Sequence, residues 1–178
     1  NWPQCPPGVL YLTSVEREKI VEPMKYVSKP VPGNPEAIEI LDGWEKRNVT
    51  TVNVKQLKGV RGANASGNVQ FHPKFAKQLV SLFQAWEDAW LLDRVLTFGG
   101  TWAPRFVRGS TTTLSQHAFA MAFDINVEWN ALGTIGALKG QKGSVRELVE
   151  IAVQHGFFWG NWFKQRNDPM HFEIYRLF

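Results

Sequence analysis

The chain has 178 residues, with 20 Lys and Arg against 16 Asp and Glu and a net charge of +4. This length predicts one domain over residues 1–178. Aromatic residues make up 13% of the sequence and charged residues only 20%, which excludes a disordered chain. No apolar run approaches the roughly 20 residues that cross a bilayer. The single cysteine, Cys5, excludes an internal disulfide and a C-x-x-C redox pair.

The first part of the chain, residues 1–45, is rich in proline and is predicted to wrap the surface. Its one predicted helix covers residues 15–24, with Thr13 and Glu16 as a capping box. A strand is predicted over residues 49–57. Residues 58–70, rich in glycine and asparagine, predict a long loop in which Arg61 faces either a ligand or plain solvent.

The clearest helix begins at Pro73 and places apolar residues at three- and four-residue spacing, which predicts a core-facing stripe of Phe75, Leu79, Leu82, Phe83, Trp86 and Trp90. A strand over residues 94–98 and a Gly-Gly break follow. A second helix is predicted after Gly143, where Ser144 and Glu147 form a capping box. Short strands are predicted over residues 122–127, 157–159 and 171–176. Helices and strands mixed without regular βαβ alternation predict an α+β domain with a small, mostly antiparallel sheet.

Two groups of polar residues could carry chemistry, and the first is His117 with Asp124. Seven residues of helix would separate the two side chains by about 10 Å along the axis. Seven residues of strand would separate them by roughly 23 Å and place them on opposite faces. Both could therefore touch one metal ion only if the chain bends between them. The alternative is a core histidine with satisfied hydrogen bonds.

The second group is Asp168, His171 and Glu173, near the end of the chain. An ordinary turn in which Asp168 caps its own backbone would explain the Asn-Asp-Pro sequence. The alternative hypothesis is that His171 is a third metal ligand and that Asp168 lies just outside the ligand set. Two histidines and one carboxylate leave one open position on a tetrahedral zinc ion, which is typical of catalytic zinc.

The sequence LSQHAFAMAFDIN at residues 114–126 resembles the S-x-H-x-x-G-x-A-x-D signature of the M15 metallopeptidases. These are zinc D-alanyl-D-alanine carboxypeptidases and L-alanyl-D-glutamate endopeptidases of bacterial cell walls, including phage endolysins. The terminal Asp168-x-x-His171 resembles the second zinc motif of this family. Ala120 stands where the signature has glycine, which would strain a left-handed backbone by about 1 kcal/mol. The resemblance implies a fold of the DD-peptidase/hedgehog type, with a catalytic core over about residues 70–178.

The resemblance also implies roles for individual residues. His117, Asp124 and His171 would bind Zn²⁺, and Asp168 would be the general base, with Glu173 as its rival or as a group that orients an imidazole. Arg105, and after it Arg108, would stabilise negative charge on the attacked carbonyl. For Arg105 and Arg108 the alternative is an ordinary surface cation, and for Ser115 the choice is between substrate binding and a local backbone hydrogen bond.

The remaining histidines, His72 and His155, are predicted to be structural. Trp129, Trp159 and Trp162 flank the motifs, where they either shape a cleft or, above all for Trp159, pack in the core.

The resemblance implies hydrolysis of the peptidoglycan stem peptide, and aspartate rather than glutamate before the last histidine favours the L-Ala–D-Glu endopeptidases. The alternatives are a D-alanyl-D-alanine carboxypeptidase and a non-catalytic module that binds the cell wall. We expect a monomer that acts outside the cytoplasm, in the periplasm or cell wall, or a phage-encoded enzyme acting on the wall. The sequence lacks basic clusters interleaved with aromatics, so no nucleic-acid partner is expected.

Overall fold

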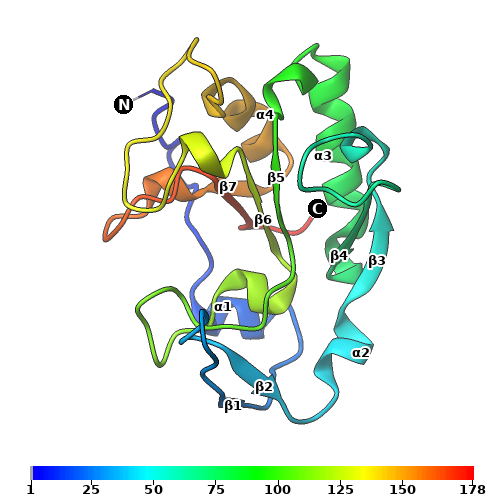
Figure 1. Ribbon diagram of the computed structural model, residues 1–178, viewed down its shortest axis with the longest axis vertical. Coiled ribbons are helices and arrows are strands. Elements are labelled where there is room, and N and C mark those ends of the chain that lie inside the picture. Colours follow the sequence, from blue (N-terminus) through cyan, green and yellow to red (C-terminus); the bar gives the residue numbers. More distant parts are fainter. Residues whose placement is uncertain (1) are drawn as a thin grey trace.

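A four-stranded antiparallel sheet in the order β5-β6-β8-β7 lies at the centre of the molecule (Figure 1). The computed structural model describes residues 2–178. Two further two-stranded antiparallel sheets pair β1 with β2 and β3 with β4. The elements are α1 Ser14–Glu18, β1 Tyr26–Ser28, β2 Ile38–Ile40, α2 Trp44–Asn48, β3 Thr50–Asn53, β4 Asn68–Phe71, α3 Ala76–Asp88, β5 Phe98–Gly100, β6 Ala122–Ile125, α4 Val149–Gln154, β7 Phe157–Trp159 and β8 His171–Ile174. The architecture is α+β, as the sequence predicts.

The two faces of the central sheet have different chemistry because side chains alternate along each strand. In β6 and β8, Phe123 pairs with Phe172, and their rings stack with centroids 5.4 Å apart. Trp86 of α3 packs edge-on against both rings, so α3 covers this apolar face. The opposite face receives the alternate residues, and here Asp124 lies directly across from His171. One face of the sheet thus belongs to the core and the other carries polar groups.

The predicted stripe along α3 forms the centre of the core, with one exception. Phe75, Leu79, Leu82 and Phe83 are buried, as is Trp86. Trp90 is 90% exposed, so its assignment to the core is wrong. The helix ends at Asp88, and Trp90 has a φ of 58° in the turn that follows. The helical spacing therefore no longer describes the direction of its side chain.

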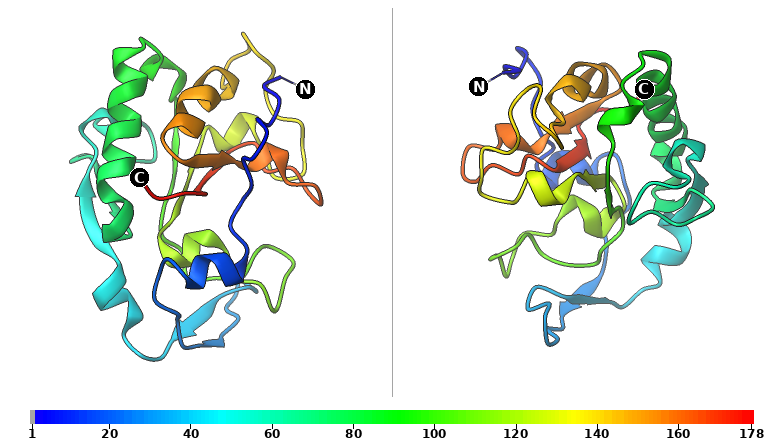
Figure 2. Two further views of the ribbon diagram at one scale, coloured as in Figure 1. Left: turned by 180° about the vertical axis from the view of Figure 1, so that it is seen from behind. Right: turned by 45° about the horizontal axis from the view of Figure 1, so that its top comes forward.

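The N-terminal segment crosses the rear of the molecule before it enters α1 (Figure 2, left). The predicted capping box at its helix is confirmed, because Thr13 Oγ1 accepts from the Glu16 backbone N–H and the Glu16 side chain accepts from the Thr13 backbone. The helix is shorter than predicted and ends at Glu18. Within residues 2–178, no helix is both long and apolar enough to cross a membrane.

Several predicted boundaries move in the structure, and β6 and β8 end at Ile125 and Ile174, before the predicted residues 127 and 176. The strand predicted over residues 49–57 ends at Asn53 and continues as a 3-10 turn, and the one predicted over residues 94–98 is observed as β5, Phe98–Gly100. The predicted loop over residues 58–70 already contains the start of β4. Its buried Val69 and Phe71 alternate as in any half-buried strand, but the surrounding glycines and asparagines dominate the local pattern.

Candidate metal centre

Three side chains from distant parts of the chain converge on one point. His117 Nε2 lies 3.1 Å from Asp124 Oδ1 and 3.1 Å from His171 Nδ1, and the last two atoms are 3.0 Å apart. His117 and His171 are buried, and Asp124 is nearly so. Among the described residues, these three form the one group of His, Cys, Asp and Glu that could hold a metal ion. The structure thus brings together all three predicted ligands.

The bend that the spacing of His117 and Asp124 requires is present. A 3-10 turn, Gln116–Phe119, carries His117, and Ala120 then adopts the left-handed conformation with φ 52° and ψ 42°. This residue reverses the chain into β6, where Asp124 follows in strand geometry. The register of β6 and β8 then brings His171 to Asp124, because the two residues are direct cross-strand neighbours.

Both imidazoles are held by a second partner on the side away from the convergence point. His117 Nδ1 lies 2.6 Å from the carbonyl oxygen of Thr101, which makes Nδ1 the protonated nitrogen and leaves Nε2 as the ligand atom. His171 Nε2 lies 2.8 Å from Glu173 Oε2, which leaves Nδ1 as its ligand atom. Glu173 therefore faces the opposite edge of the His171 ring from the atom offered to a metal. This is the geometry of a group that orients the ring.

The electrostatics of the cluster favour an ionised carboxylate. Burial by itself raises the pKa of Asp124, but the charges and hydrogen bonds of His117 and His171 outweigh burial and hold it well below its usual range. Burial lowers the pKa of His171, but its hydrogen bonds to Asp124 and Glu173 raise it more, to about 10. Metal binding at this cluster requires an unprotonated ligand nitrogen on each imidazole, so it would release protons.

Asp168 lies beside the cluster on the loop that leads into β8. Its Oδ1 is buried and has no hydrogen-bond partner among the described residues. Burial raises the pKa of Asp168, and the charge of His171, which is close enough to act on it, opposes this effect. A buried carboxylate oxygen without a partner is costly unless a ligand or water completes it. Asp168 thus offers a free acceptor close to His171, whose backbone N–H donates to the Asp168 carbonyl at 3.1 Å.

The comparisons with known proteins bear on these same residues. A family model described as D-alanyl-D-alanine carboxypeptidase matches residues 108–174, a segment that contains His117, Asp124, Asp168 and His171. This match supports an M15 family peptidase. No curated protein and no solved structure matches the chain.

The structure also gives defined contacts to the other residues predicted for the site, Arg105, Arg108 and Ser115. Arg105 is half-buried; burial lowers its pKa, and Asp124 and Asp168 are among the charges that oppose this effect. Arg108 forms an ion pair of 2.7 Å with Glu36. The buried Ser115 Oγ accepts from the His117 backbone N–H at 3.2 Å, so its hydroxyl caps the turn that carries the ligand.

Other residues named from the sequence also have defined places. Arg61 pairs with Glu128 at the surface. Trp159 is buried and donates to the Pro169 carbonyl, which confirms it as core. His72 caps the turn before α3 through Nδ1, and the Nδ1 of His155 lies 2.8 Å from the Ile151 carbonyl oxygen, so both have the structural contacts predicted for them.

Several groups that shape the candidate site could not be identified by the sequence motifs. The Thr101 carbonyl has no sequence signal, because any residue supplies one. Gly99 lies against Asp124, where an added Cβ would be 3.0 Å from the Asp124 Cβ; Gly160 lies against His171, where an added Cβ would also be 3.0 Å away. Both glycines permit the close approach of a ligand residue to the neighbouring backbone. The presence of glycine at these two positions was the feature of the sequence that could have indicated this close approach.

Proposed function

We propose that the chain is a zinc peptidase that hydrolyses the L-Ala–D-Glu bond of the peptidoglycan stem peptide. One observation carries the proposal: three ligand atoms within 3.1 Å of one another beside a buried carboxylate oxygen that has no partner among the described residues. The match to a peptidase family over the same residues supports it. The choice of bond rests on aspartate rather than glutamate at position 168.

The donor set suits zinc. Two imidazole nitrogens and one carboxylate oxygen leave a fourth tetrahedral position for water or substrate. Zinc bonds of about 2.0–2.1 Å would place the ligand atoms about 3.3 Å apart, so the observed spacing needs only a small expansion. When bound, the ion would polarise the substrate carbonyl and make water a nucleophile near neutral pH.

In this proposal the other residues of the site have separate roles in catalysis and substrate binding. Asp168 takes the proton from the attacking water and passes it to the leaving amine, since burial makes its carboxylate a stronger base. Arg105 places a half-buried positive charge near Asp124 and Asp168, where it stabilises negative charge on the carbonyl oxygen. Glu173 keeps the His171 ring oriented. Ser115 and Arg108 are the proposed contacts to the stem peptide.

The test separates the two acidic residues. Asp168→Asn should retain about one zinc ion per chain by metal analysis, while turnover of purified muropeptides falls by at least about 100-fold. Glu173→Gln should instead weaken zinc binding by about 10- to 100-fold while zinc-saturated turnover suffers less. Near-parent turnover in Asp168→Asn would overturn the role of Asp168 as the base.

Mass analysis of the products shows which bond of the stem peptide is cleaved. Cleavage between L-Ala and D-Glu supports the endopeptidase. Release of D-Ala alone would identify the second candidate, a D-alanyl-D-alanine carboxypeptidase, which the description of the matching family favours. Binding to sacculi without soluble fragments, with zinc supplied, would leave a non-catalytic wall-binding module. We propose further that the protein is a monomer that acts outside the cytoplasm, as a wall enzyme or a phage endolysin.

A further inference from the structure

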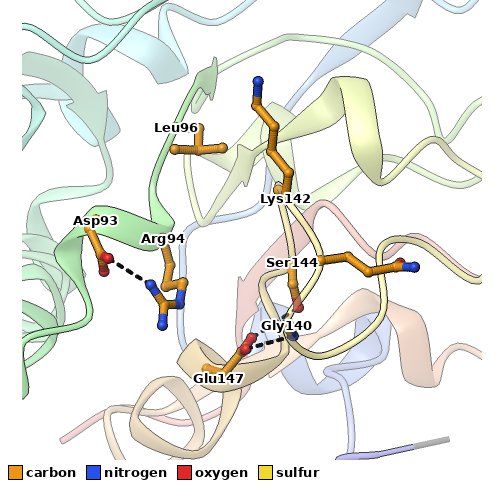
Figure 3. A pocket seen from close by; sticks show the side chains of 9 residues that line it. Asp93, Arg94, Leu96, Gly140, Lys142, Ser144 and Glu147 are labelled. Carbon is orange, nitrogen blue, oxygen red and sulfur yellow. Dashed lines mark hydrogen bonds and ion pairs between the residues drawn. The ribbon is translucent and has the colours of Figure 1, made fainter.

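Two hollows lie on either side of the loop at residues 140–143, and they differ in chemistry. The first has a volume of about 300 Å³ and appears in Figure 3. Three of its charged groups are already held: Arg94 pairs with Asp93 at 2.6 Å, and Glu147 accepts from the Gly140 N–H and the Ser144 hydroxyl, whereas Lys142 lines both hollows. This hollow therefore has little polar capacity left for a ligand.

The second hollow is an open groove of about 580 Å³ lined by Trp129, Thr134, Ile135, Gly136, Ala137, Gln141 and Lys142. The backbone of Gly143 packs against Trp129, where an added Cβ would lie 2.3 Å from the indole Cγ. This support fixes the half-buried indole at the wall of the groove. Ile135 is 65% exposed and lines the same groove, so a second large apolar side chain adds to the surface that the indole offers.

Hydrogen-bonding groups border this aromatic wall. Lys142 Nζ lies 5.5 Å from the centre of the Trp129 ring. Gln141 uses its carbonyl oxygen to hold the Leu138 backbone N–H, which leaves its amide N–H groups as the donors it can offer. A rigid aromatic surface rimmed by a few polar donors suits a ligand with apolar faces and many oxygen acceptors. A sugar ring has this chemistry.

The groove is connected to the segment that carries Asp168. Its loop is attached to the segment that carries Asp168, because the Gly133 N–H donates to the Asn167 carbonyl at 2.7 Å. Gly136 lies against Pro169, where an added Cβ would be 2.8 Å from the proline Cβ. Trp129 itself follows β6, the strand of the ligand Asp124, by one short turn.

We propose that this groove, the Trp129 groove, binds the glycan strand that carries the stem peptide. The inference rests on the proposed function. The stem peptide is joined through its L-Ala to the lactyl group of the amino sugar, so an enzyme that cuts after this residue works with the sugar within about two residue lengths, roughly 7 Å, of the reacting carbonyl. A carboxypeptidase acting at the far end of the stem would have no such need. Glycan binding in this groove would therefore favour cleavage of the L-Ala–D-Glu bond over release of the terminal D-Ala.

The first experiment measures binding without any peptide. The probe is peptide-free glycan strands of alternating N-acetylglucosamine and N-acetylmuramic acid, titrated into the zinc-loaded protein and followed by NMR of the indole N–H groups. Trp129→Ala and Ile135→Glu should each weaken binding by at least about tenfold. Ile135 is exposed, so Ile135→Glu keeps the test valid if Trp129→Ala fails to fold. Trp90→Ala, at an exposed tryptophan that lines neither hollow, is the matched control and should bind as the parent does.

The second experiment compares hydrolysis of glycan-linked stems with hydrolysis of the same stems released from glycan. We expect kcat/KM to favour the linked substrate by about tenfold or more, and Ile135→Glu to bring the ratio toward one. Equal rates on both substrates, or strands that do not bind the parent, would overturn the groove while leaving the peptidase intact. Strands that bind without hydrolysis of either substrate would support the groove and overturn the proposed function.

Discussion

Ala120 shows how much a single backbone conformation contributes to this site. It is fully buried, and its φ of 52° is what turns the chain from the His117 turn into β6. The left-handed region costs a residue with a Cβ about 1–2 kcal/mol, whereas glycine enters it freely. The strain considered from the sequence at this position is therefore present in the structure.

The first prediction follows at this scale. Ala120→Gly should raise the free energy of unfolding by about 0.5–1 kcal/mol, because relief of the left-handed strain exceeds the added entropy of the unfolded chain. Urea unfolding of the zinc-loaded protein measures it. Ala122→Gly, the same change two residues on in regular β6, is the control and should destabilise. A loss of stability in both variants would refute the strain.

At the scale of elements, Asn126 links the end of β6 to two other segments. Its Oδ1 accepts from the Leu96 and Thr97 backbone N–H groups at 2.8 and 3.0 Å. Its Nδ2 donates to the carbonyls of Arg94 and Gly143 at 2.7 and 3.1 Å. One fully buried amide thus holds the approach to β5 and the loop at residues 140–143 against the strand that carries Asp124.

Removal of this amide should therefore lower the stability of the whole fold. Asn126→Ala leaves three backbone groups without their partner, while the Gly143 carbonyl keeps Asn130 as a donor, and should lower the free energy of unfolding by about 3 kcal/mol. Chemical denaturation measures the change. Asn53→Ala removes an exposed asparagine side chain from β3 and should cost about 1 kcal/mol or less. Equal effects of the two substitutions would contradict the linking role of Asn126.

At the scale of the whole molecule, the N-terminal segment contributes to the interior as well as the surface. Arg17 of α1 is buried, and its guanidinium carbon lies 4.0 Å from the centre of the Phe119 ring in the turn that carries His117. Burial lowers the pKa of Arg17, and Glu173 is among the charges that oppose this effect. Residues separated by about 100 positions in the sequence thus support the same site.

A second buried group makes the stability of the whole fold depend on pH. His72 packs between Trp44 and Phe75, and its Nδ1 accepts from the Lys74 backbone N–H. Burial, with a smaller contribution from the charge of Lys74, lowers its pKa from 6.5 to about 4. Between these values the unfolded chain binds a proton that the folded chain does not, so stability falls as the pH falls through this window.

His72→Asn keeps an acceptor for the cap and removes this titration. The free energy of unfolding of the parent should fall relative to that of the variant by about 2–3 kcal/mol between pH 7.5 and pH 4. Urea unfolding at several pH values measures the difference, and the values at pH 7.5 give the baseline for packing changes. Parallel pH profiles for the two proteins would rule out His72 as the cause.

The sequence by itself determined what depends on residue type and local spacing. It predicted His117, Asp124 and His171 as metal ligands, and the structure brings these three side chains together; it also predicted the bend between the first two, the cap at Thr13 and most of the core stripe on α3. These features follow from donor chemistry, helical periodicity and local hydrogen bonds, which a short window of sequence contains.

Only the tertiary structure decided which groups meet across the fold. Asp124 and His171 are 47 residues apart, and the register of β6 and β8 alone places them opposite each other. The same register sets Glu173 behind the His171 ring, and the path of the N-terminal segment buries Arg17 beneath the His117 turn. Such contacts depend on non-local packing, in which many registers and chain paths fit the same local pattern until the whole core excludes all but one.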